Sequence, residues 1–262
     1  MTETFQLEPH AMVIGALGGS GTRAVAEAFE RLGYVHGPAL NRSRDCLDFT
    51  YLFVRTDWMA SPLPSINHRL GILRGVAETG HHPEAAPLDR LTDVVTERNS
   101  AAEGRAFLVK EPNSHMFADE ILAAWPDAAF LFVHRHPLDM AFSSNTNQLK
   151  RWGEALGISA ERSGSLPAAQ LDVWIHARQA QTARERRLGG RTASLDYERF
   201  IEAPVATLRR ACQALGMKIT NARLEEACRN VTIPDSRGRW REQDLSCFRE
   251  DQLAYCRDDG WL

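Results

Sequence analysis

Residues 130–143 have the sequence FLFVHRHPLDMAFS, an apolar run that ends abruptly in a polar segment containing a proline. The run up to Val133 predicts a buried strand, and Pro137 suits the first turn of a helix. This order places Arg135 in the loop after the strand, and the helix brings Ser143 back toward it. A guanidinium and a hydroxyl beside a helix N-terminus can hold an anion, so we predict an anion site here.

A second anion-binding pattern is the segment GALGGSGTR at residues 15–23. It follows a short apolar strand predicted at residues 12–14, and apolar residues at helical spacing follow it up to Gly33. Backbone N–H groups of such a turn can point at one phosphate or sulfate, and the helix dipole adds positive charge. The alternative is a tight turn in which the glycines serve packing alone. The predicted binding residues are Gly18, Gly19, Ser20, Gly21, Thr22 and Arg23.

These two patterns together indicate a nucleotide that carries phosphates at two ends. A Walker P-loop would have lysine after its last glycine, whereas Thr22 and Arg23 follow Gly21 here. P-loop enzymes also hold magnesium partly through an acidic residue at the end of a neighbouring strand. Arg135 stands at that place in this chain. Both departures count against an ATPase or an ordinary kinase, and we predict no metal site.

The composition is that of an ordinary globular protein. The chain has 262 residues, of which 44% are hydrophobic and 25% charged, and a formal net charge of -3. This charge gives no general attraction to nucleic acid or to anionic membranes, so anion binding depends on local cations. The N-terminus does not resemble a secretory signal and no segment is apolar enough to span a membrane, so we expect a cytoplasmic protein. The five cysteines form no C-x-x-C pair, which argues against a disulfide framework and a zinc site.

Apolar runs alternate with helical patterns along the rest of the chain. Strands are predicted at residues 106–109, 129–134 and 191–195, and helices lie around 117–125, from Ser165 to Gly189 and from Pro204 to Gly216. Five prolines break up residues 34–103, which we expect to be irregular. The first two of these strands should be joined by a right-handed crossover and end at the same edge. We predict one α/β domain over residues 1–262, with a central parallel sheet flanked by helices in three layers, like a P-loop protein.

In these features the sequence resembles the sulfotransferases that use 3′-phosphoadenosine 5′-phosphosulfate. Residues 19–22, Gly-Ser-Gly-Thr, match the Ser-Gly-Thr core of the family motif that holds the 5′-phosphosulfate. Arg135 and Ser143 have the spacing of the pair that holds the 3′-phosphate. The segment LDYERF at residues 195–200 resembles a further family segment, Tyr-Glu-x-Leu. The likeness extends from residue 12 to about residue 216.

One departure from the family concerns the first motif. Its lysine, which stabilises the leaving phosphate, is replaced by Gly19 in this chain. Arg23 and Lys110 are the candidates to supply the missing charge. We favour Lys110, because Val109-Lys110-Glu111-Pro112 resembles the Lys-x-Pro segment of glycosaminoglycan and related sulfotransferases and ends a strand at the expected catalytic edge.

The resemblance also implies a general base and a loop over the nucleotide. Candidates for the base are Asp45 and Asp48, since related enzymes often carry it after the first helix, with Glu111 in reserve. Arg-Gly loops in the family close over the 3′-phosphate, which suggests a role for Arg237, Gly238 and Arg239. Each of these residues has a plain alternative as a surface or packing residue, and Arg135 could instead pair with Asp139.

The resemblance implies metal-independent transfer of a sulfuryl group from 3′-phosphoadenosine 5′-phosphosulfate to a hydroxyl of a carbohydrate or small metabolite. Two alternatives stay open: a catalytically inactive nucleotide-binding module, suggested by Gly19, and a P-loop nucleotide kinase with a degenerate Walker motif. The sequence identifies neither the acceptor nor the oligomeric state.

Overall fold

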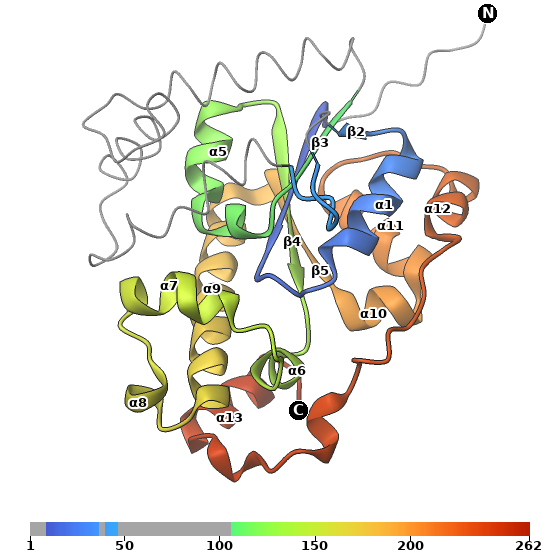
Figure 1. Cartoon of the computed structure of the whole chain (residues 1–262). Coiled ribbons are helices and arrows are strands. Elements are labelled where there is room, and N and C mark those ends of the chain that lie inside the picture. The colour runs from blue at the N-terminus through green and yellow to red at the C-terminus, as the bar shows by residue number, and fades with distance from the viewer. Residues whose placement is uncertain (1–8, 37–39, 47–105) are drawn as a thin grey trace, which may run out of the picture.

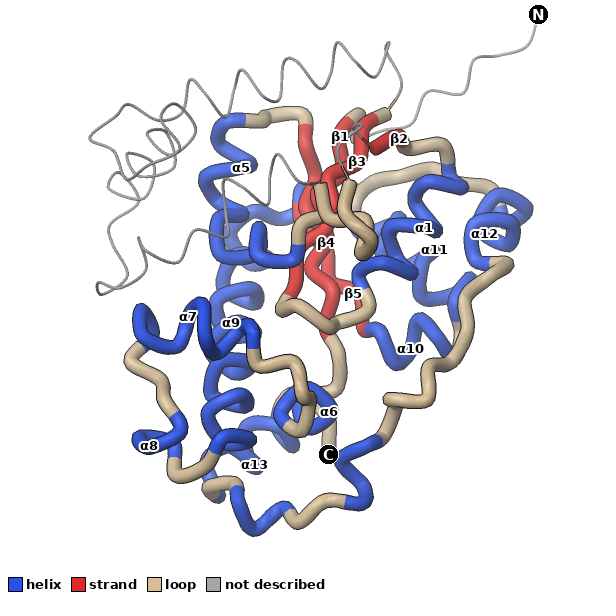
Figure 2. Tube along the Cα trace, viewed as in Figure 1, coloured by secondary structure: helices blue, strands red, loops and turns tan. Residues whose placement is uncertain are grey.

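A computed structural model describes residues 9–36, 40–46 and 106–262 of the chain. Their strands form one parallel five-stranded sheet in the order β2-β3-β1-β4-β5. Helices flank both faces of the sheet (Figures 1 and 2), which confirms the predicted three-layer α/β class. The strands are β1 (Ala11–Ala16), β2 (Val35–His36), β3 (Phe107–Lys110), β4 (Ala128–His134) and β5 (Thr192–Asp196).

The strands at the centre of the sheet are buried on both faces. Along β4, Leu131 and Val133 belong to one hydrophobic cluster, while Phe130 and Phe132 belong to another on the opposite face. Successive side chains of a strand point to opposite faces, so a continuous apolar run fits a strand that is covered on both faces. The run therefore predicted the correct strand. β1 continues past the predicted residues 12–14 through Gly15, where an added Cβ would lie 2.5 Å from the Phe130 ring.

Two groups of helices cover the sheet. On one face lie α1 (Thr22–Leu32), α10 (Tyr197–Glu202), α11 (Pro204–Ala214) and α12 (Asn221–Cys228). On the other lie α5 (Ala118–Ala124), α7 (Asn147–Leu156) and α9 (Leu166–Leu188). The remaining described helices are α6 (Pro137–Ala141), α8 (Ala160–Ser163) and α13 (Glu250–Asp258), with short 3-10 helices η2 (Pro112–Phe117), η3 (Gly189–Arg191), η4 (Arg239–Glu242) and η5 (Leu245–Cys247). Within the described ranges, no helix has the length and apolar character of a membrane span.

Local capping explains where several helices begin. The Ser165 hydroxyl accepts a hydrogen bond from the Ala168 N–H at 3.1 Å, and α9 ends at Gly189 as predicted. The helix predicted around residues 117–125 is divided into η2 and α5. The reason is local. The Glu111 carboxylate caps η2 by accepting from the Asn113 N–H at 3.0 Å, and Pro112 occupies the first position of this 3-10 helix.

The topology brings the strand ends that matter to one edge. β1 lies between β3 and β4, and all of these strands are parallel, so their carboxyl ends meet. In open parallel sheets a ligand site forms outside the carboxyl ends, where successive connections diverge to opposite sides. Here that place is the loop after β1, between the ends of β3 and β4.

Gly21 offers a test of how tightly this edge is packed. It has φ 83°, and an added Cβ would lie 2.1 Å from the Tyr197 ring, whereas Gly164 has φ 91° and nothing within 4 Å of such a Cβ. Both Gly21→Ala and Gly164→Ala carry the strain of a left-handed alanine. We expect Gly21→Ala to lower the free energy of unfolding by about 1–3 kcal/mol more, measured by urea denaturation. Equal losses would contradict the close packing of the loop on Tyr197.

Candidate active site

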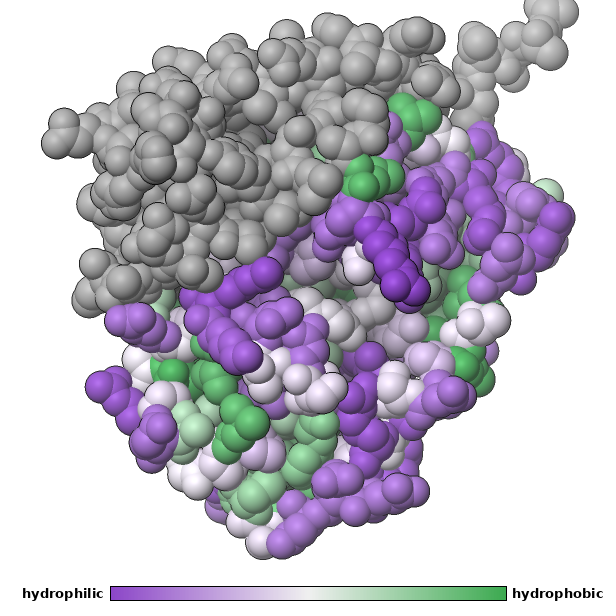
Figure 3. Space-filling model, viewed as in Figure 1, coloured by the Kyte–Doolittle hydropathy of each residue, from purple (hydrophilic) through white to green (hydrophobic). Residues whose placement is uncertain are grey.

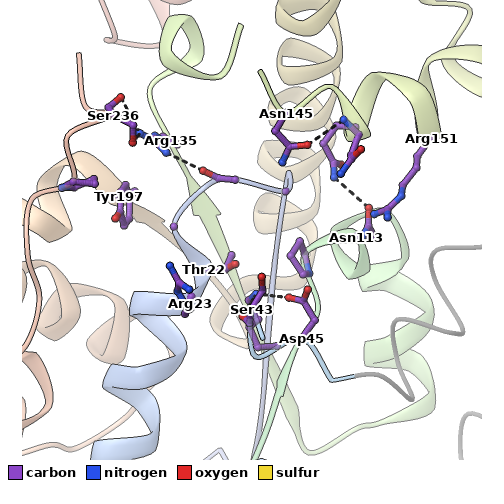
Figure 4. Close-up of a pocket in the computed structure, with 18 residues that line it drawn as sticks. Thr22, Arg23, Ser43, Asp45, Asn113, Arg135, Asn145, Arg151, Tyr197 and Ser236 are labelled. Atoms are coloured by element: carbon purple, nitrogen blue, oxygen red, sulfur yellow. Dashed lines mark hydrogen bonds and ion pairs between the residues drawn. The ribbon is translucent and has the colours of Figure 1, made fainter. Parts of the chain in front are cut away.

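A cavity of about 450 Å³ lies at the carboxyl edge of the sheet. Pockets for small ligands and cofactors have volumes in this range. Hydrophilic residues border the hollow in Figure 3, and Figure 4 shows the side chains that surround it. The described lining residues are Gly18, Gly19, Gly21, Thr22, Arg23, Ser43, Asp45, Lys110, Pro112, Asn113, Arg135, Asn145, Asn147, Gln148, Arg151, Tyr197, Pro234 and Ser236.

The glycine loop after β1 forms one wall of the cavity. Gly19 and Gly21 both adopt left-handed backbone conformations, with φ 98° and 83°, that side chains rarely allow. Gly21 is the N-cap of α1, and among the described residues no side chain caps this helix. The first backbone N–H groups of a helix have no partner within it, so they are left available to an anion.

Arg135 forms a second wall of the cavity, at the end of β4 and in contact with the glycine loop. Only 8% of the residue is exposed. Its guanidinium donates from Nη1 to the Gly19 carbonyl at 3.1 Å, and from Nη2 to the Ser236 hydroxyl at 2.8 Å and carbonyl at 3.1 Å (Figure 4). The guanidinium carbon lies 5.7 Å from the centre of the Tyr197 ring. A buried cation therefore joins the glycine loop to the C-terminal segment.

A neighbouring carboxyl group accompanies this cation. Glu198 Oε1 lies 3.9 Å from Arg135 Nε, and Glu198 Oε2 accepts from the His136 N–H at 2.9 Å. Burial raises the pKa of Glu198 to about 7. At a slightly acidic pH this carboxyl group is therefore mostly neutral, and it leaves the charge of Arg135 largely uncompensated.

Lys110 and Asp45 meet at the end of β3. The Lys110 ammonium, 2% exposed as a residue, donates to the Asp45 carboxylate and to the Ser43 carbonyl at 3.0 Å. The segment that carries Asp45 is fixed over this strand end, because the Cys46 N–H donates to the Lys110 carbonyl at 2.8 Å. A cation and a carboxylate from distant parts of the sequence are thus placed side by side in the cavity wall.

The third wall consists of η2 and α7. Asn113 Oδ1 accepts from Gln148 Nε2 at 3.4 Å and from Trp152 Nε1 at 3.3 Å, which fixes the two elements against each other. Among the described lining residues, four are cations, and Asp45 is the one carboxylate. The cations are Arg23, Lys110, Arg135 and Arg151. Such a balance favours an anionic ligand. No group of three His, Cys, Asp or Glu side chains in the described part of the chain could hold a metal ion.

Comparison with known families identifies the class of protein. Residues 61–221 match the model of the sulfotransferase family, and this range is more than half of the chain. The chain belongs to the sulfotransferase family. The matched range contains Lys110, Arg135 and Ser143 and excludes the glycine loop. The chain is accordingly a transferase, and the kinase alternative is wrong.

Solved sulfotransferase structures share the fold of this sulfotransferase. The sulfotransferase domain of the Synechococcus PCC 7002 olefin synthase aligns with a TM-score of 0.55 and 17% identity, over 98% of this chain and 96% of that one. The sulfotransferase domain from the curacin biosynthetic pathway gives 0.55 and 12%, over 98% and 99%. A sulfotransferase from Alicyclobacillus acidocaldarius gives 0.51 and 18%, over 96% and 92%. A search of curated protein sequences gave no match.

The structure brings most of the predicted site residues of this sulfotransferase together. Five residues of the glycine loop line the cavity with Arg135, Lys110 and Asp45: Gly18, Gly19, Gly21, Thr22 and Arg23. Ser20 belongs to the same loop but is buried and does not line the cavity. Its N–H donates to the Leu17 carbonyl at 3.2 Å. Asp48 lies outside the described residues.

Ser143 and Glu111 do not line the cavity. The Ser143 hydroxyl, just after α6, accepts from the N–H of Asn145, which does line it, at 3.2 Å. The Glu111 carboxylate is buried and accepts from both the backbone and the side-chain amide of Asn113, at 3.0 and 2.6 Å. Glu111 therefore supports η2 and does not face the cavity.

The C-terminal loop approaches the site through a residue that the sequence did not indicate. Arg237 pairs with Glu202, and Arg239 Nε donates to the Ser236 carbonyl at 3.1 Å, so that Ser236 is the residue that reaches Arg135.

Asp139 holds this loop in place. Its carboxylate accepts from the Gly238 N–H at 2.7 Å and the Trp240 N–H at 3.2 Å. The structure therefore gives Asp139 the backbone of the loop as its partner, and not Arg135.

Sequence reasoning also missed several lining residues. Tyr197 follows β5 directly, in the segment that resembles the family, so its place at the end of a strand was an available signal. The polar residues of α7 gave no such signal, because Asn147, Gln148 and Arg151 look like the solvated side of an amphipathic helix.

The raised pKa of Glu198 predicts a pH effect on stability. An unfolded glutamate titrates near pH 4.5, so between this pH and about 7 the folded protein binds the proton more tightly and loses stability as the pH rises. The wild type should lose about 2–3 kcal/mol of unfolding free energy over this pH range. We expect Glu198→Gln to abolish this loss, because its amide does not titrate while its oxygen still accepts from the His136 N–H.

Urea denaturation from acidic to neutral pH measures this difference. Glu225→Gln, at an exposed position of α12, is the matched control and should keep the wild-type profile. A Glu198→Gln profile parallel to that of the wild type would show that this carboxyl group titrates normally in the folded protein.

Proposed function

We propose that this sulfotransferase moves a sulfuryl group from 3′-phosphoadenosine 5′-phosphosulfate to an acceptor hydroxyl. The observation that carries the proposal is the direct contact between the two anion-binding elements. Arg135 donates to the Gly19 carbonyl at 3.1 Å, and both residues line one cavity. A ligand with anionic groups at two ends can therefore contact both elements at once.

The residues present fit such a nucleotide. Arg135 lines the cavity, its hydrogen bonds go to a carbonyl and to Ser236, and the nearest carboxyl oxygen, Glu198 Oε1, lies 3.9 Å from Nε, so its positive charge is available to a ligand. We assign the 3′-phosphate to Arg135, with Ser143 supporting this wall through Asn145, and the 5′-phosphosulfate to the glycine loop and the start of α1. Arginine suits phosphate, because its planar donors match the oxygens.

Lys110 and Asp45 are proposed as the residues that act on the reacting groups. When bound, the donor supplies the sulfuryl group, whose bond to the phosphate oxygen breaks as its bond to the acceptor oxygen forms. Lys110, with Arg23 as a second cation, would stabilise negative charge on the leaving phosphate, which Gly19 cannot do. Asp45 would take the proton of the acceptor hydroxyl. The ion pair with Lys110 holds this carboxylate in the cavity wall.

The transfer is proposed to need no metal ion. The sulfuryl group bears less negative charge than a phosphoryl group, and fixed cations and backbone N–H groups can stabilise it by position. Arg135 also occupies the end of β4, near where magnesium-dependent P-loop enzymes hold an acidic residue. We expect transfer to be unchanged by EDTA.

Binding of adenosine 3′,5′-bisphosphate tests the nucleotide assignment. We expect Arg135→Ala to weaken its binding about 10- to 100-fold, as for loss of hydrogen bonds to a charged group, and Ser143→Ala to weaken it less. Binding of adenosine 5′-monophosphate should change little, because it lacks the 3′-phosphate. Arg199→Ala, an exposed arginine of α10, is the control. Affinities are measured by calorimetry. If Arg135→Ala lost the same affinity for both nucleotides, Arg135 would not be the residue that binds the 3′-phosphate.

The catalytic assignment is tested by turnover. We expect Asp45→Asn to lower kcat about 10²- to 10⁴-fold and to leave bisphosphate binding within a few-fold of wild type. Lys110→Met should also lower kcat, while Lys218→Met, at an exposed lysine, should not. Wild-type binding of the bisphosphate with no transfer to any acceptor would favour the inactive binding module that Gly19 suggests.

A further inference from the structure

The wall of the cavity formed by η2 and α7 carries polar groups that the donor assignment does not use. Figure 4 shows Arg151 and Asn113 on the side of the cavity away from Arg135, Tyr197 and Ser236. Asn113 and Gln148 bond to each other here, and Arg151 follows Gln148 by three residues on the same helix, α7. This wall meets the glycine loop at Gly18, where an added Cβ would lie 2.7 Å from Gln148 Nε2, and Arg151 continues it along α7.

Arg151 brings a positive charge to this wall. The residue is partly buried and lines the cavity. Within the described ranges it takes part in no ion pair, and the nearby lining carboxylate, Asp45, is already held by Lys110. A partly buried arginine that has no ion pair in the protein attracts an oxyanionic group of a bound ligand.

Gln148 supplies an independent indication of a ligand. Only 7% of this residue is exposed, and its Oε1 atom is buried without a hydrogen-bond partner among the described residues. Its Nε2 atom is directed to Asn113 Oδ1, at 3.4 Å. A buried amide oxygen without a donor is costly, so a hydroxyl of a bound molecule would satisfy it.

The order of strands assigns this wall to the acceptor. The proposed donor contacts the ends of β4 and β1, through Arg135 and the glycine loop. β3 lies on the other side of β1, and its end carries Lys110, which pairs with Asp45. Beyond the phosphosulfate, the free volume is therefore bordered by the proposed base and by Arg151, Gln148 and Asn113.

We propose that Arg151 binds an oxyanionic group of the acceptor, so that the acceptor is a hydroxyl compound that also carries a carboxylate or phosphate. The inference rests on the proposed function. Gln148 accepts a hydrogen bond from a hydroxyl of the same molecule, and Arg151 acts as a specificity-determining residue. If instead Arg151 contacts the phosphosulfate in place of the missing lysine, its loss must weaken donor binding.

The experiment compares transfer to acidic acceptors with transfer to neutral compounds of similar shape. The probes are glucuronate, glucose 6-phosphate and methyl glucoside, together with 4-hydroxyphenylacetate and its methyl ester. Wild-type enzyme should transfer sulfate to at least one acid, with kcat/KM at least about 10-fold above that of its neutral counterpart. Arg151→Met should abolish this preference by lowering kcat/KM for the acid alone. Lys150→Met, the exposed neighbour on α7, is the matched control and should keep it.

Binding of adenosine 3′,5′-bisphosphate to each variant separates the possible failures. Unchanged binding in Arg151→Met, with loss of acid preference, supports the inference. Weakened binding in Arg151→Met would place Arg151 on the donor and overturn it, as would the absence of transfer to every acid, or equal losses for acids and neutral compounds. Failure of the wild type to bind the bisphosphate would overturn the proposed function itself.

Discussion

The buried guanidinium of Arg135 is the constraint on which the rest of the site depends. It bonds to the Gly19 carbonyl and to Ser236, so it fixes the glycine loop after β1 and the C-terminal segment relative to β4. Burial of a cation costs several kcal/mol unless an anion or hydrogen bonds compensate. Carbonyl and hydroxyl oxygens compensate part of this cost, and Glu198, whose pKa burial raises to about 7, adds little negative charge at slightly acidic pH. The remaining positive potential is available to an anionic ligand.

Residues far from one another in the sequence maintain this arrangement. The Trp174 indole N–H, on α9, donates to the Arg135 carbonyl at 3.0 Å, so α9 fixes the backbone of Arg135. Asp139, 1% exposed, holds the N–H groups of Gly238 and Trp240 and thereby places Ser236 on Arg135. The geometry that a charged ligand needs thus comes from contacts of Trp174, Asp139 and the backbone within the protein. Such preorganisation lowers the entropic cost of ordering the site when a ligand binds.

The sequence predicted four of the five strands of the described sheet, and it predicted that the glycine loop and Arg135 follow two of them, because apolar runs and glycines are local signals. It missed β2, which lies in the segment expected to be irregular. It was insufficient where a position is set by a distant partner. Nothing near Asp45 indicates that its carboxylate meets Lys110, which is brought there by the fold of segment 40–46 over β3. Likewise, Glu111 was a candidate base because it follows Lys110. Successive side chains at a strand end point in opposite directions, however, and the Glu111 carboxylate accepts from Asn113.

The geometry of Gly19 disfavours a lysine at this position of the first motif. Gly19 has φ 98°, and its carbonyl is turned toward Arg135. An added Cβ would meet only ordinary contacts, with Asn145 Nδ2 at 3.6 Å, so space does not exclude a side chain. The left-handed backbone disfavours one, because a lysine in this conformation carries a strain of about 1–2 kcal/mol. In this conformation the Gly19 carbonyl accepts from Arg135, and the cation that we propose in place of the lysine is Lys110 at the end of β3.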